Sequence, residues 1–347
     1  MDNIHKKNLF GMSKAEIEEI VKKNNWQAYR AKQIYGWVYQ GIGQIDAMSN
    51  LPGHIREELK QQYDIFHLQI IEKFEEKKTK TTKYLLRTED DLLIEAVLLR
   101  YKHGNSLCIS SQAGCNMACV FCASAIGGLQ RNLSAAEMLS QLYVAEEDTG
   151  KKISNVVMMG SGEPLDNYEN TIGFLELVSD KDTRNLSKRN ITVSTCGIAD
   201  KIVLLADSGA GVNLSVSLHS PFQEQREKIM PVARKFSLKE LMEACRYYAE
   251  KTKRRITLEY ALISGVNDTP EHALALAQLT KTLHCLVNLI PMNETSRPLL
   301  KGSGEKNVAA FAEILTKRQI TVTIRRTLGS SINAACGQLR SGFYKGD

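Results

Sequence analysis

Three cysteines stand close together in the segment Cys115-Asn-Met-Ala-Cys119-Val-Phe-Cys122. Their C-x3-C-x2-C spacing lets three thiolates converge on one metal centre within a short loop. A structural zinc ion needs four protein ligands, whereas three cysteines on a cluster of four irons leave one iron open for a chelating ligand. The spacing therefore favours a [4Fe-4S] cluster, with a zinc knuckle completed by Cys108 as the alternative.

A second motif, Met159-Gly-Ser-Gly-Glu163-Pro164, follows about one strand and helix later. Gly160 and Gly162 let the backbone approach a ligand closely, and Glu163 can accept a hydrogen bond from an ammonium group. Together the two motifs resemble the radical SAM superfamily, in which the open iron holds the amino and carboxylate groups of S-adenosylmethionine (SAM). Ser161 departs from the hydrophobic residue often found there in that superfamily.

The segment from Val212 to Ser220 alternates strictly between apolar and polar residues. In a parallel βα barrel the outer face of each strand packs on helices, so the polar set must point into the lumen. A closed barrel normally fills its lumen with branched apolar side chains, and a polar lumen indicates a site along the barrel axis. An exposed sheet face is the alternative. The residues predicted to face the lumen are Asn213, Ser215, Ser217 and His219.

Strand and helix patterns alternate from residue 107 onward, which is typical of parallel βα units. Capping boxes at Ser134-Ala-Ala-Glu137 and Ser237-Leu-Lys-Glu240 begin two helices, and Pro270 fits the first turn of another. The pattern predicts an α/β fold, a partial (β/α)6 TIM-type barrel of the radical SAM kind. Its strands are expected at 107–111, 154–159, 190–196, 212–219, 255–263, 285–292 and 320–325.

The segments that flank this core have different patterns. Residues near the start carry helical periodicity with a capping box at Ser13-Lys-Ala-Glu16, whereas Leu68 to Arg100 read as short extended segments. The chain is therefore predicted to contain a helical accessory domain at 1–75, a β-hairpin linker at 76–100, the core barrel at 101–330 and a C-terminal tail at 331–347.

The composition is that of an ordinary globular protein, with 43% hydrophobic and 24% charged residues among 347. The first 14 residues show no secretory signal, and no 18 consecutive apolar residues occur, so no membrane helix is expected. Eight cysteines without an export signal predict a cytoplasmic protein whose thiols stay reduced. The net charge of +6 permits a nucleic-acid partner without requiring one.

Motifs spread over essentially the whole chain resemble the RlmN/Cfr family of radical SAM RNA adenine methyltransferases. The resemblance implies methylation of carbon 2 of a specific adenine in 23S rRNA, with tRNA as a second substrate. It also assigns RNA binding to the accessory domain. The motifs are Leu107-Cys-Ile-Ser-Ser-Gln112, the cysteine loop, Gly162-Glu163-Pro164, Ser217-Leu-His219 and Ala334-Ala-Cys-Gly-Gln338.

The resemblance further implies a two-stage route that consumes two SAM molecules per turnover. Cys336 takes a methyl group from the first SAM. The second SAM is cleaved reductively to a 5'-deoxyadenosyl radical, which abstracts hydrogen from that methyl group so that the carbon radical adds to the base. Glu95 accepts a proton, and Cys108 attacks Cys336 to release the product with a transient disulfide. The SAM contacts implied are Gly162, Glu163, Ser194, Ser217, Leu218, His219 and Asn293.

The residue patterns alone leave several of these roles open. An isolated cysteine such as Cys336 is ordinarily a small buried hydrophobe, an acid such as Glu95 in a half-polar strand is ordinarily solvated, and His219 fits a core histidine. The expected partners are 23S rRNA, tRNA and a flavodoxin-type electron donor, with a monomeric protein and no membrane. Candidate phosphate contacts are Arg254-Arg255, Arg325-Arg326 and the lysines of 75–83.

Three rival functions remain at this point. The resistance branch of the same family methylates carbon 8 with the same cysteines, although Val287 to Asn293 and Arg325-Arg326 look more like the housekeeping branch. A zinc-stabilised RNA-binding module would have no catalysis and no colour. A radical SAM enzyme for a small molecule would not need the accessory domain.

Overall fold

The computed structural model describes residues 6–102, 104–292, 300–326, 328–334 and 338. Within these ranges ten strands form one sheet, in the order β14-β13-β12-β11-β10-β9-β6-β5-β4-β3. Every neighbouring pair from β6 to β14 is parallel, which confirms the predicted α/β barrel class. The strands of this core are β6 (Gly104–Cys108), β9 (Asn155–Met158), β10 (Ile191–Thr195), β11 (Asn213–Ser217), β12 (Ile256–Leu262), β13 (Cys285–Pro291) and β14 (Val322–Ile324).

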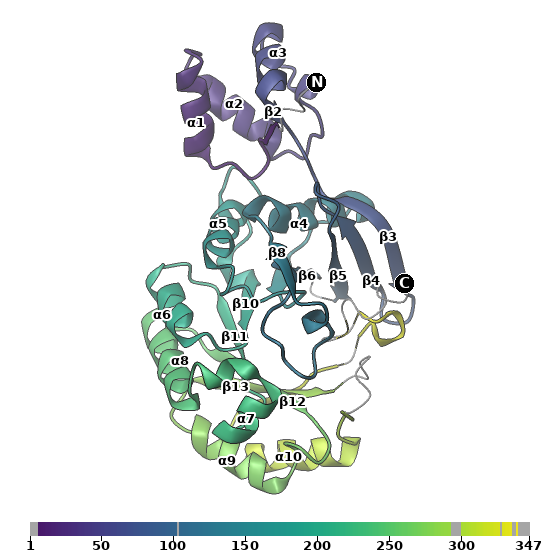
Figure 1. The fold of residues 1–347 in the computed structure, drawn as a ribbon, viewed down its shortest axis with the longest axis vertical. Helices are drawn as coiled ribbons and strands as arrows, with labels where there is room; N and C mark the ends of the chain where they lie inside the picture. Colours follow the sequence, from purple (N-terminus) through teal and green to yellow (C-terminus); the bar gives the residue numbers. More distant parts are fainter. Residues whose placement is uncertain (1–5, 103, 293–299, 327, 335–337, 339–347) are drawn as a thin grey trace.

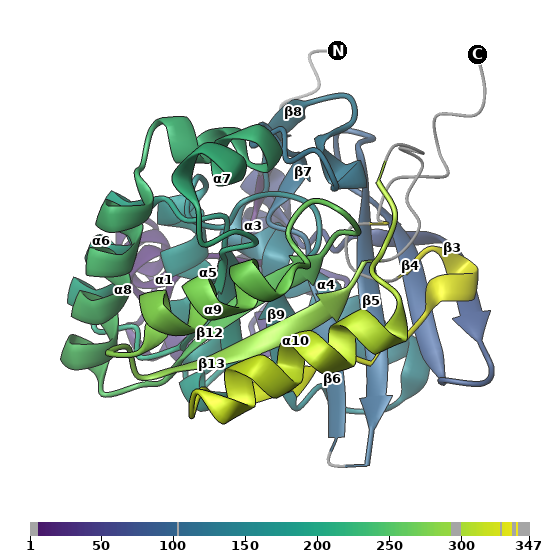
Figure 2. The ribbon, with the colours of Figure 1, turned by 90° about the horizontal axis from the view of Figure 1, so that it is seen from below.

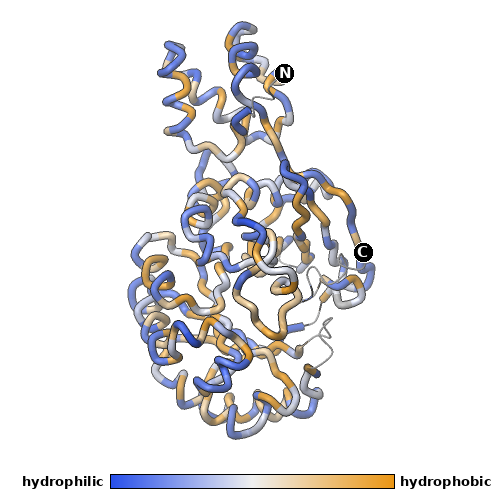
Figure 3. The backbone as a smooth tube through the Cα atoms, viewed as in Figure 1, coloured by the Kyte–Doolittle hydropathy of each residue, from blue (hydrophilic) through white to orange (hydrophobic). Residues whose placement is uncertain are grey.

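Helices connect the parallel strands and lie on the outer side of the sheet (Figures 1 and 2). The predicted capping boxes are present, since the Ser134 and Ser237 hydroxyls accept from the backbone N–H of Glu137 and Glu240. Hydrophobic and hydrophilic residues alternate along these helices, as expected for a layer with one buried face (Figure 3). They are α4 (Ala135–Thr149), α5 (Tyr168–Ser179), α6 (Ala199–Asp207), α7 (Gln223–Ile229), α8 (Leu238–Thr252), α9 (Pro270–Thr280) and α10 (Glu305–Lys317).

Strand β11 follows the alternation read from the sequence. Its apolar residues and their flanking neighbours Val212 and Leu218 are fully buried in the main hydrophobic core. The hydroxyl of Tyr248 in α8 donates to the carbonyl of Val212, which fixes the helix to the strand. The apolar face therefore packs on helices and the polar face lines the interior, as the barrel interpretation requires.

Strands β3 (Gln69–Glu76), β4 (Thr81–Arg87) and β5 (Leu93–Tyr101) extend the barrel sheet by antiparallel pairing. The segment 76–100, predicted as a linker, thus belongs to the same sheet, because β5 pairs along most of its length with β6. Residues 69–75 are likewise strand rather than helix. We refer to β3–β5 as the antiparallel wing.

The N-terminal residues form a separate helical unit at one end of the molecule, with α1 (Lys14–Lys23), α2 (Tyr29–Val38) and α3 (Gly53–Gln62) (Figure 1). Short strands β1 (Lys7–Asn8) and β2 (Tyr63–Asp64) close it. The unit is seated on α4, where a Cβ on Gly11 would come within 2.3 Å of the Ala136 Cβ. No helix among the described residues is long and apolar enough to span a membrane.

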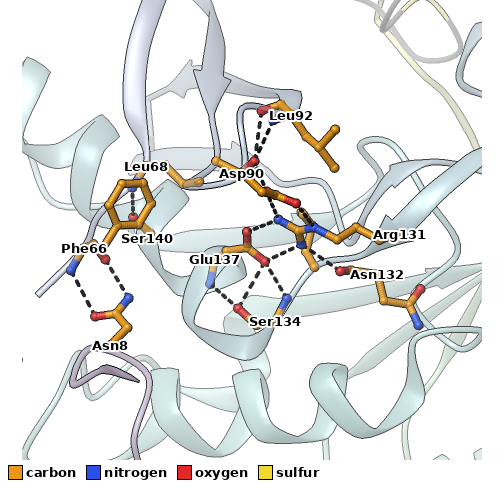
Figure 4. A network of polar contacts seen from close by, with 12 residues as sticks. Asn8, Phe66, Leu68, Asp90, Leu92, Arg131, Asn132, Ser134, Glu137 and Ser140 are labelled. Carbon is orange, nitrogen blue, oxygen red and sulfur yellow. Dashed lines mark hydrogen bonds and ion pairs between the residues drawn. The ribbon is translucent and has the colours of Figure 1, made fainter. Parts of the chain in front are cut away.

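Figure 4 shows how this seat is tied to the core. The backbone N–H of Leu68 donates to the Ser140 hydroxyl of α4 at 2.8 Å. Nearby, the Arg131 guanidinium donates both to Asp90 in the turn between β4 and β5 and to Glu137 in α4. Three separate elements are thus held together by one planar, bidentate cation.

Candidate active site

One cavity at the carboxyl ends of the parallel strands collects most of the predicted site residues. Ligands of open parallel sheets and barrels bind at these strand ends, because the loops that follow them converge there. The predicted residues that line the cavity are Cys115, Cys119, Cys122, Gly162, Glu163, Ser194, Ser217 and His219. Leu218 does not line it, because its side chain faces the apolar core.

The three cysteines stand in a loop that a two-stranded hairpin frames. β7 (Gln112–Gly114) pairs with β8 (Leu129–Asn132), and the Cys115 N–H donates to the Gly128 carbonyl at 3.1 Å. On the other side the Val120 N–H donates to the Ile229 carbonyl at the end of α7, also at 3.1 Å. The loop is therefore anchored at both flanks before any ligand binds.

Burial governs the chemistry of these thiols. Desolvation raises the pKa of Cys115 to about 12 and raises the pKa of Cys119 as well. Buried thiols become thiolates when a metal supplies the compensating positive charge, so the donor set fits a metal centre. The fourth thiol that a zinc knuckle would need, Cys108, does not line this cavity. The three thiols therefore fit a multi-iron cluster, in which each binds a different iron, better than a zinc ion with four protein ligands.

Glu163 presents a buried carboxylate to the same cavity. Its oxygens accept from the backbone N–H of Cys196 at 2.6 Å and of Leu165 at 3.0 Å, and desolvation raises its pKa. Gly162 has φ +103°, and a Cβ there would lie 2.6 Å from the Gln112 Cβ, so only glycine fits. The carboxylate keeps lone pairs for an ammonium group of a ligand, and a bound cation would compensate its buried charge.

Ser161, the departure from the superfamily pattern, does not line the cavity. Its buried hydroxyl donates to the Ser124 hydroxyl in the cysteine loop at 3.3 Å. The serine therefore links the glycine motif to the segment that carries the cysteines. This contact explains why a polar residue is tolerated in a buried position.

His219 closes the end of β11 with a left-handed backbone, φ +55°. Its Nδ1 accepts from the Ala261 N–H at 2.9 Å, and burial lowers its pKa to about 3. The imidazole is therefore neutral with its proton on Nε2, and Phe121 of the cysteine loop packs edge-on against it at 4.8 Å between ring centroids. The histidine is both satisfied within the core and part of the cavity wall.

Two charged residues that sequence reasoning did not assign to the cavity also line it. Glu259 in β12 is buried and accepts from the Ser215 hydroxyl at 2.7 Å and the Asn288 amide at 2.8 Å. Arg325 follows β14, and its Nη1 approaches the Met159 sulfur at 3.7 Å. The period-two pattern Thr257, Glu259 in β12 was the signal available for the first of them.

Cys108 and Glu95 lie outside this cavity, Glu95 in the wing strand β5 and Cys108 in the neighbouring core strand β6. Cys108 is a buried cysteine at the end of β6, and it belongs to a small apolar cluster with Val97, Leu99 and Ala334. Glu95 is 1% exposed and pairs with the Lys83 Nζ at 3.1 Å, so it is not a solvated acid. Cys336 and Asn293 lie outside the described residues, and so does the disulfide with Cys336 that the resemblance implies.

The described start of the tail is fixed near these residues. Glu76 at the end of β3 accepts from the Gly329 N–H at 3.1 Å and from the Ser331 N–H at 3.2 Å. The Ser331 hydroxyl donates to the same carboxylate at 2.5 Å. Ala334 then packs into the Cys108 cluster. The chain thus reaches Cys108 two residues before position 336.

The cysteine loop, the buried glycine motif and the parallel strands together define a radical SAM enzyme, a class that uses a [4Fe-4S] cluster and SAM. Residues 109–277 match the model of the Radical SAM superfamily. Residues 7–65 match the ribosomal RNA large subunit methyltransferase N-terminal domain.

Comparison with whole proteins narrows the class. A "probable dual-specificity RNA methyltransferase RlmN" of Clostridium beijerinckii is 48% identical over 97% of this chain and 95% of that protein. A protein of the same name from Clostridium botulinum strain Alaska E43 is 48% identical over 98% of both. The crystal structure of a radical SAM methyltransferase from Sphaerobacter thermophilus superposes with a TM-score of 0.92 at 39% identity, covering 96% of this chain and 99% of that one. This chain belongs to the RlmN family of radical SAM RNA methyltransferases.

Proposed function

We propose that this enzyme methylates carbon 2 of a specific adenine in 23S rRNA and in tRNA. The observation that carries the proposal is the pairing of two sites on one sheet: a SAM-type cavity at the strand ends, and Cys108 beside the start of the tail. The identity to dual-specificity relatives over nearly the whole chain supports the choice of both RNA classes. The accessory domain is proposed to bind the RNA.

The residues of the cavity are proposed to bind and orient SAM. Cys115, Cys119 and Cys122 would hold the [4Fe-4S] cluster, and a bound cluster supplies the electron for reductive cleavage of SAM. The Glu163 carboxylate would accept from the SAM ammonium, and the hydroxyls at the ends of β10 and β11 would face its ribose and carboxylate. His219, held neutral by burial, adds no charge beside the cationic sulfonium of SAM.

The methyl group is proposed to travel through the tail. Carbon 2 of adenine lies between two ring nitrogens and is too electron-poor to displace the methyl of SAM directly. The Cys336 thiolate would accept a methyl group from one SAM, and a second SAM would be consumed to activate it, giving two SAM molecules per turnover. After the carbon joins the base, Glu95 would take up the proton from carbon 2.

The Cys108 thiolate would then attack the sulfur of Cys336 and form a disulfide. The electron pair of the broken sulfur–carbon bond stays on the released methylene carbon, which takes up a proton and becomes the methyl group of the base. The packing of Ala334 on Cys108 supports this step, because it brings the tail to the attacking thiol. Cytoplasmic thiols would reduce the disulfide, and a flavodoxin-type donor would reduce the cluster of the monomeric enzyme.

The test is an anaerobic assay of the reconstituted enzyme with methyl-labelled SAM, a reductant and unmodified rRNA or tRNA in separate reactions. We expect labelled 2-methyladenosine in the digested nucleosides of both. In Cys336→Ala no label should reach protein or RNA, whereas Cys108→Ala should accumulate RNA joined to protein. Labelled 8-methyladenosine would move the enzyme to the resistance branch, and product from only one RNA would remove the other substrate.

A further inference from the structure

Arg226 in α7 is a fully buried cation, with 0% of its surface exposed. Its Nε donates to the Leu218 carbonyl at 3.1 Å. Its Nη2 donates to the carbonyls of Cys196 at 2.6 Å and Ser217 at 3.1 Å. Its Nη1 is buried as well and has no hydrogen-bond partner among the described residues. Nη1 of the guanidinium is therefore not used by any of the described residues.

The charge of Arg226 has no carboxylate to balance it among the described residues. Its nearest titratable neighbours are the thiols of Cys196, Cys119 and Cys245, which burial keeps neutral, and burial also lowers the pKa of Arg226. A guanidinium without a counter-charge in such a place costs several kcal/mol, on the order of the desolvation penalty of a buried ion. Backbone carbonyls offset part of this penalty, but a full negative charge is missing from the pocket.

The place of that missing charge is indicated by the elements around Arg226. The carbonyl of Ile229, one turn further along α7, accepts from Val120 next to Cys119. Met230, which follows α7, lines the cavity of the three cysteines. The backbone is also shaped to admit the guanidinium, because Gly197 has φ +106° and a Cβ there would lie 2.9 Å from Nη2.

We propose that Arg226 is the internal counter-ion of the iron–sulfur cluster and sets its reduction potential. The inference deepens the proposed function and rests on it. A [4Fe-4S] core held by three thiolates carries a net negative charge, and reduction adds to it. A fixed cation beside the loop favours the reduced state, because charge and hydrogen bonds near the cluster control its potential.

The test compares Arg226→Met with Arg226→Lys in anaerobically reconstituted full-length protein. Both variants lose the guanidinium contacts to three carbonyls, but only the lysine variant keeps the charge. Iron and sulfide content is measured first, and the midpoint potential is then found by redox titration followed by electron paramagnetic resonance. We expect Arg226→Met to disfavour reduction at least tenfold, about 59 mV per tenfold for one electron, and Arg226→Lys to stay near wild type.

Arg234→Met is the matched control, because it removes one positive charge from an exposed residue a few positions away. Its potential should equal that of wild type, since solvent screens it. Equal shifts in the Met and Lys variants of Arg226, or no shift in either, would overturn the inference and leave Arg226 a structural tie between strand ends. A wild-type protein that takes up no cluster would overturn the proposed function and the inference together.

Thermal unfolding of the cluster-free proteins separates the two roles further. Without the cluster, a buried counter-ion has no opposite charge and destabilises the folded protein, whereas the hydrogen bonds of a structural residue stabilise the fold with or without the cluster. We expect Arg226→Met to lower the melting temperature less in the empty protein than in the reconstituted one. An equal loss in both states would contradict the counter-ion role.

Discussion

The cavity at the strand ends and the seam between the wing and the tail are built differently. In the cavity, Glu163 and His219 are buried, and each is fixed by a hydrogen bond from a backbone N–H, while Arg226 next to it donates to backbone carbonyls. In the seam, the described residues 328–334 contact a half-buried carboxylate, Glu76, and a small apolar cluster around Cys108. The cavity is preorganised by buried hydrogen bonds, whereas the described start of the tail rests on the sheet through a few partly exposed contacts.

This difference fits the work proposed for each region. A site that holds a cluster and SAM gains from fixed dipoles, because they need no rearrangement during the reaction. In the proposed route the tail meets SAM, then RNA, then Cys108, and such movement is easier when few contacts have to break. The predictions below test whether the two regions respond as differently as their construction suggests.

The largest effect is expected from the cavity. Cys119→Ala removes one of three thiolates, so the protein should lose its broad absorbance near about 400 nm and all SAM cleavage. Cys245→Ala is the control, because Cys245 is buried in α8 within the apolar core and outside the cavity. Retention of a complete cluster by the Cys119 variant, shown by iron and sulfide analysis, would refute the ligand assignment.

The next effect concerns the buried pair of the wing, Lys83 and Glu95, whose side chains are 6% and 1% exposed. Lys83→Met removes the ammonium beside a buried carboxylate and should lower the free energy of unfolding by about 3–5 kcal/mol, measured by urea denaturation. Combining it with Glu95→Leu should recover much of the loss. Lys73→Met, at the exposed pair with Asp148, should change little. Similar losses at both lysines would show that burial does not distinguish them.

A smaller effect is expected at the tail anchor. Glu76→Ala removes the acceptor for Gly329 and Ser331, so the tail should dwell less often beside Cys108. Formation of the Cys108–Cys336 disulfide under a mild oxidant should slow severalfold, as measured by intact mass after alkylation. Cluster content and melting temperature should not change. Glu75→Ala, at the exposed neighbouring residue, is the control, and an equal slowing there would remove the role of Glu76.

The smallest effect is a dependence on pH. Hydrogen bonds, chiefly from the Ser331 side chain and then from Thr79, lower the pKa of Glu76 to about 2 from an ordinary value near 4.5. Because the folded-state pKa is depressed, the anchor is complete above about pH 4.5 and is lost as the pH falls toward 2. Amide hydrogen exchange of 328–334 should show protection that declines only in this window. Glu76→Gln should remove the decline, and an unchanged decline would assign it to another group.

The sequence predicted the parts whose signals are local. Strand alternation at Val212 to Ser220, the capping boxes and the cysteine spacing each lie within a few residues, and each predicted core strand overlaps an observed one, although the first begins at Gly104 rather than at Leu107. Leu218 was chosen as a SAM contact by resemblance, although the same alternation places it on the apolar face. Local pattern was the better guide at that residue.

The parts that the sequence missed depend on distant contacts. Glu76 and Ser331 are 255 residues apart, and the residues around neither of them predict the contact. Arg226 sits in a short polar helix and reads as a solvated cation, since burial of a single charge leaves no periodic signal. The wing read as a linker because periodicity identifies strands but not the neighbours with which they pair.

Gly11 lies at the contact through which the accessory domain packs on α4. The domain projects from α4 (Figure 1), and at Gly11 its chain lies so close to Ala136 that a single methyl group would not fit. A small tilt forced at this contact grows with distance toward α1 and α3. If the accessory domain binds RNA as proposed, the close contact at Gly11 helps to fix the orientation in which that RNA would reach the barrel.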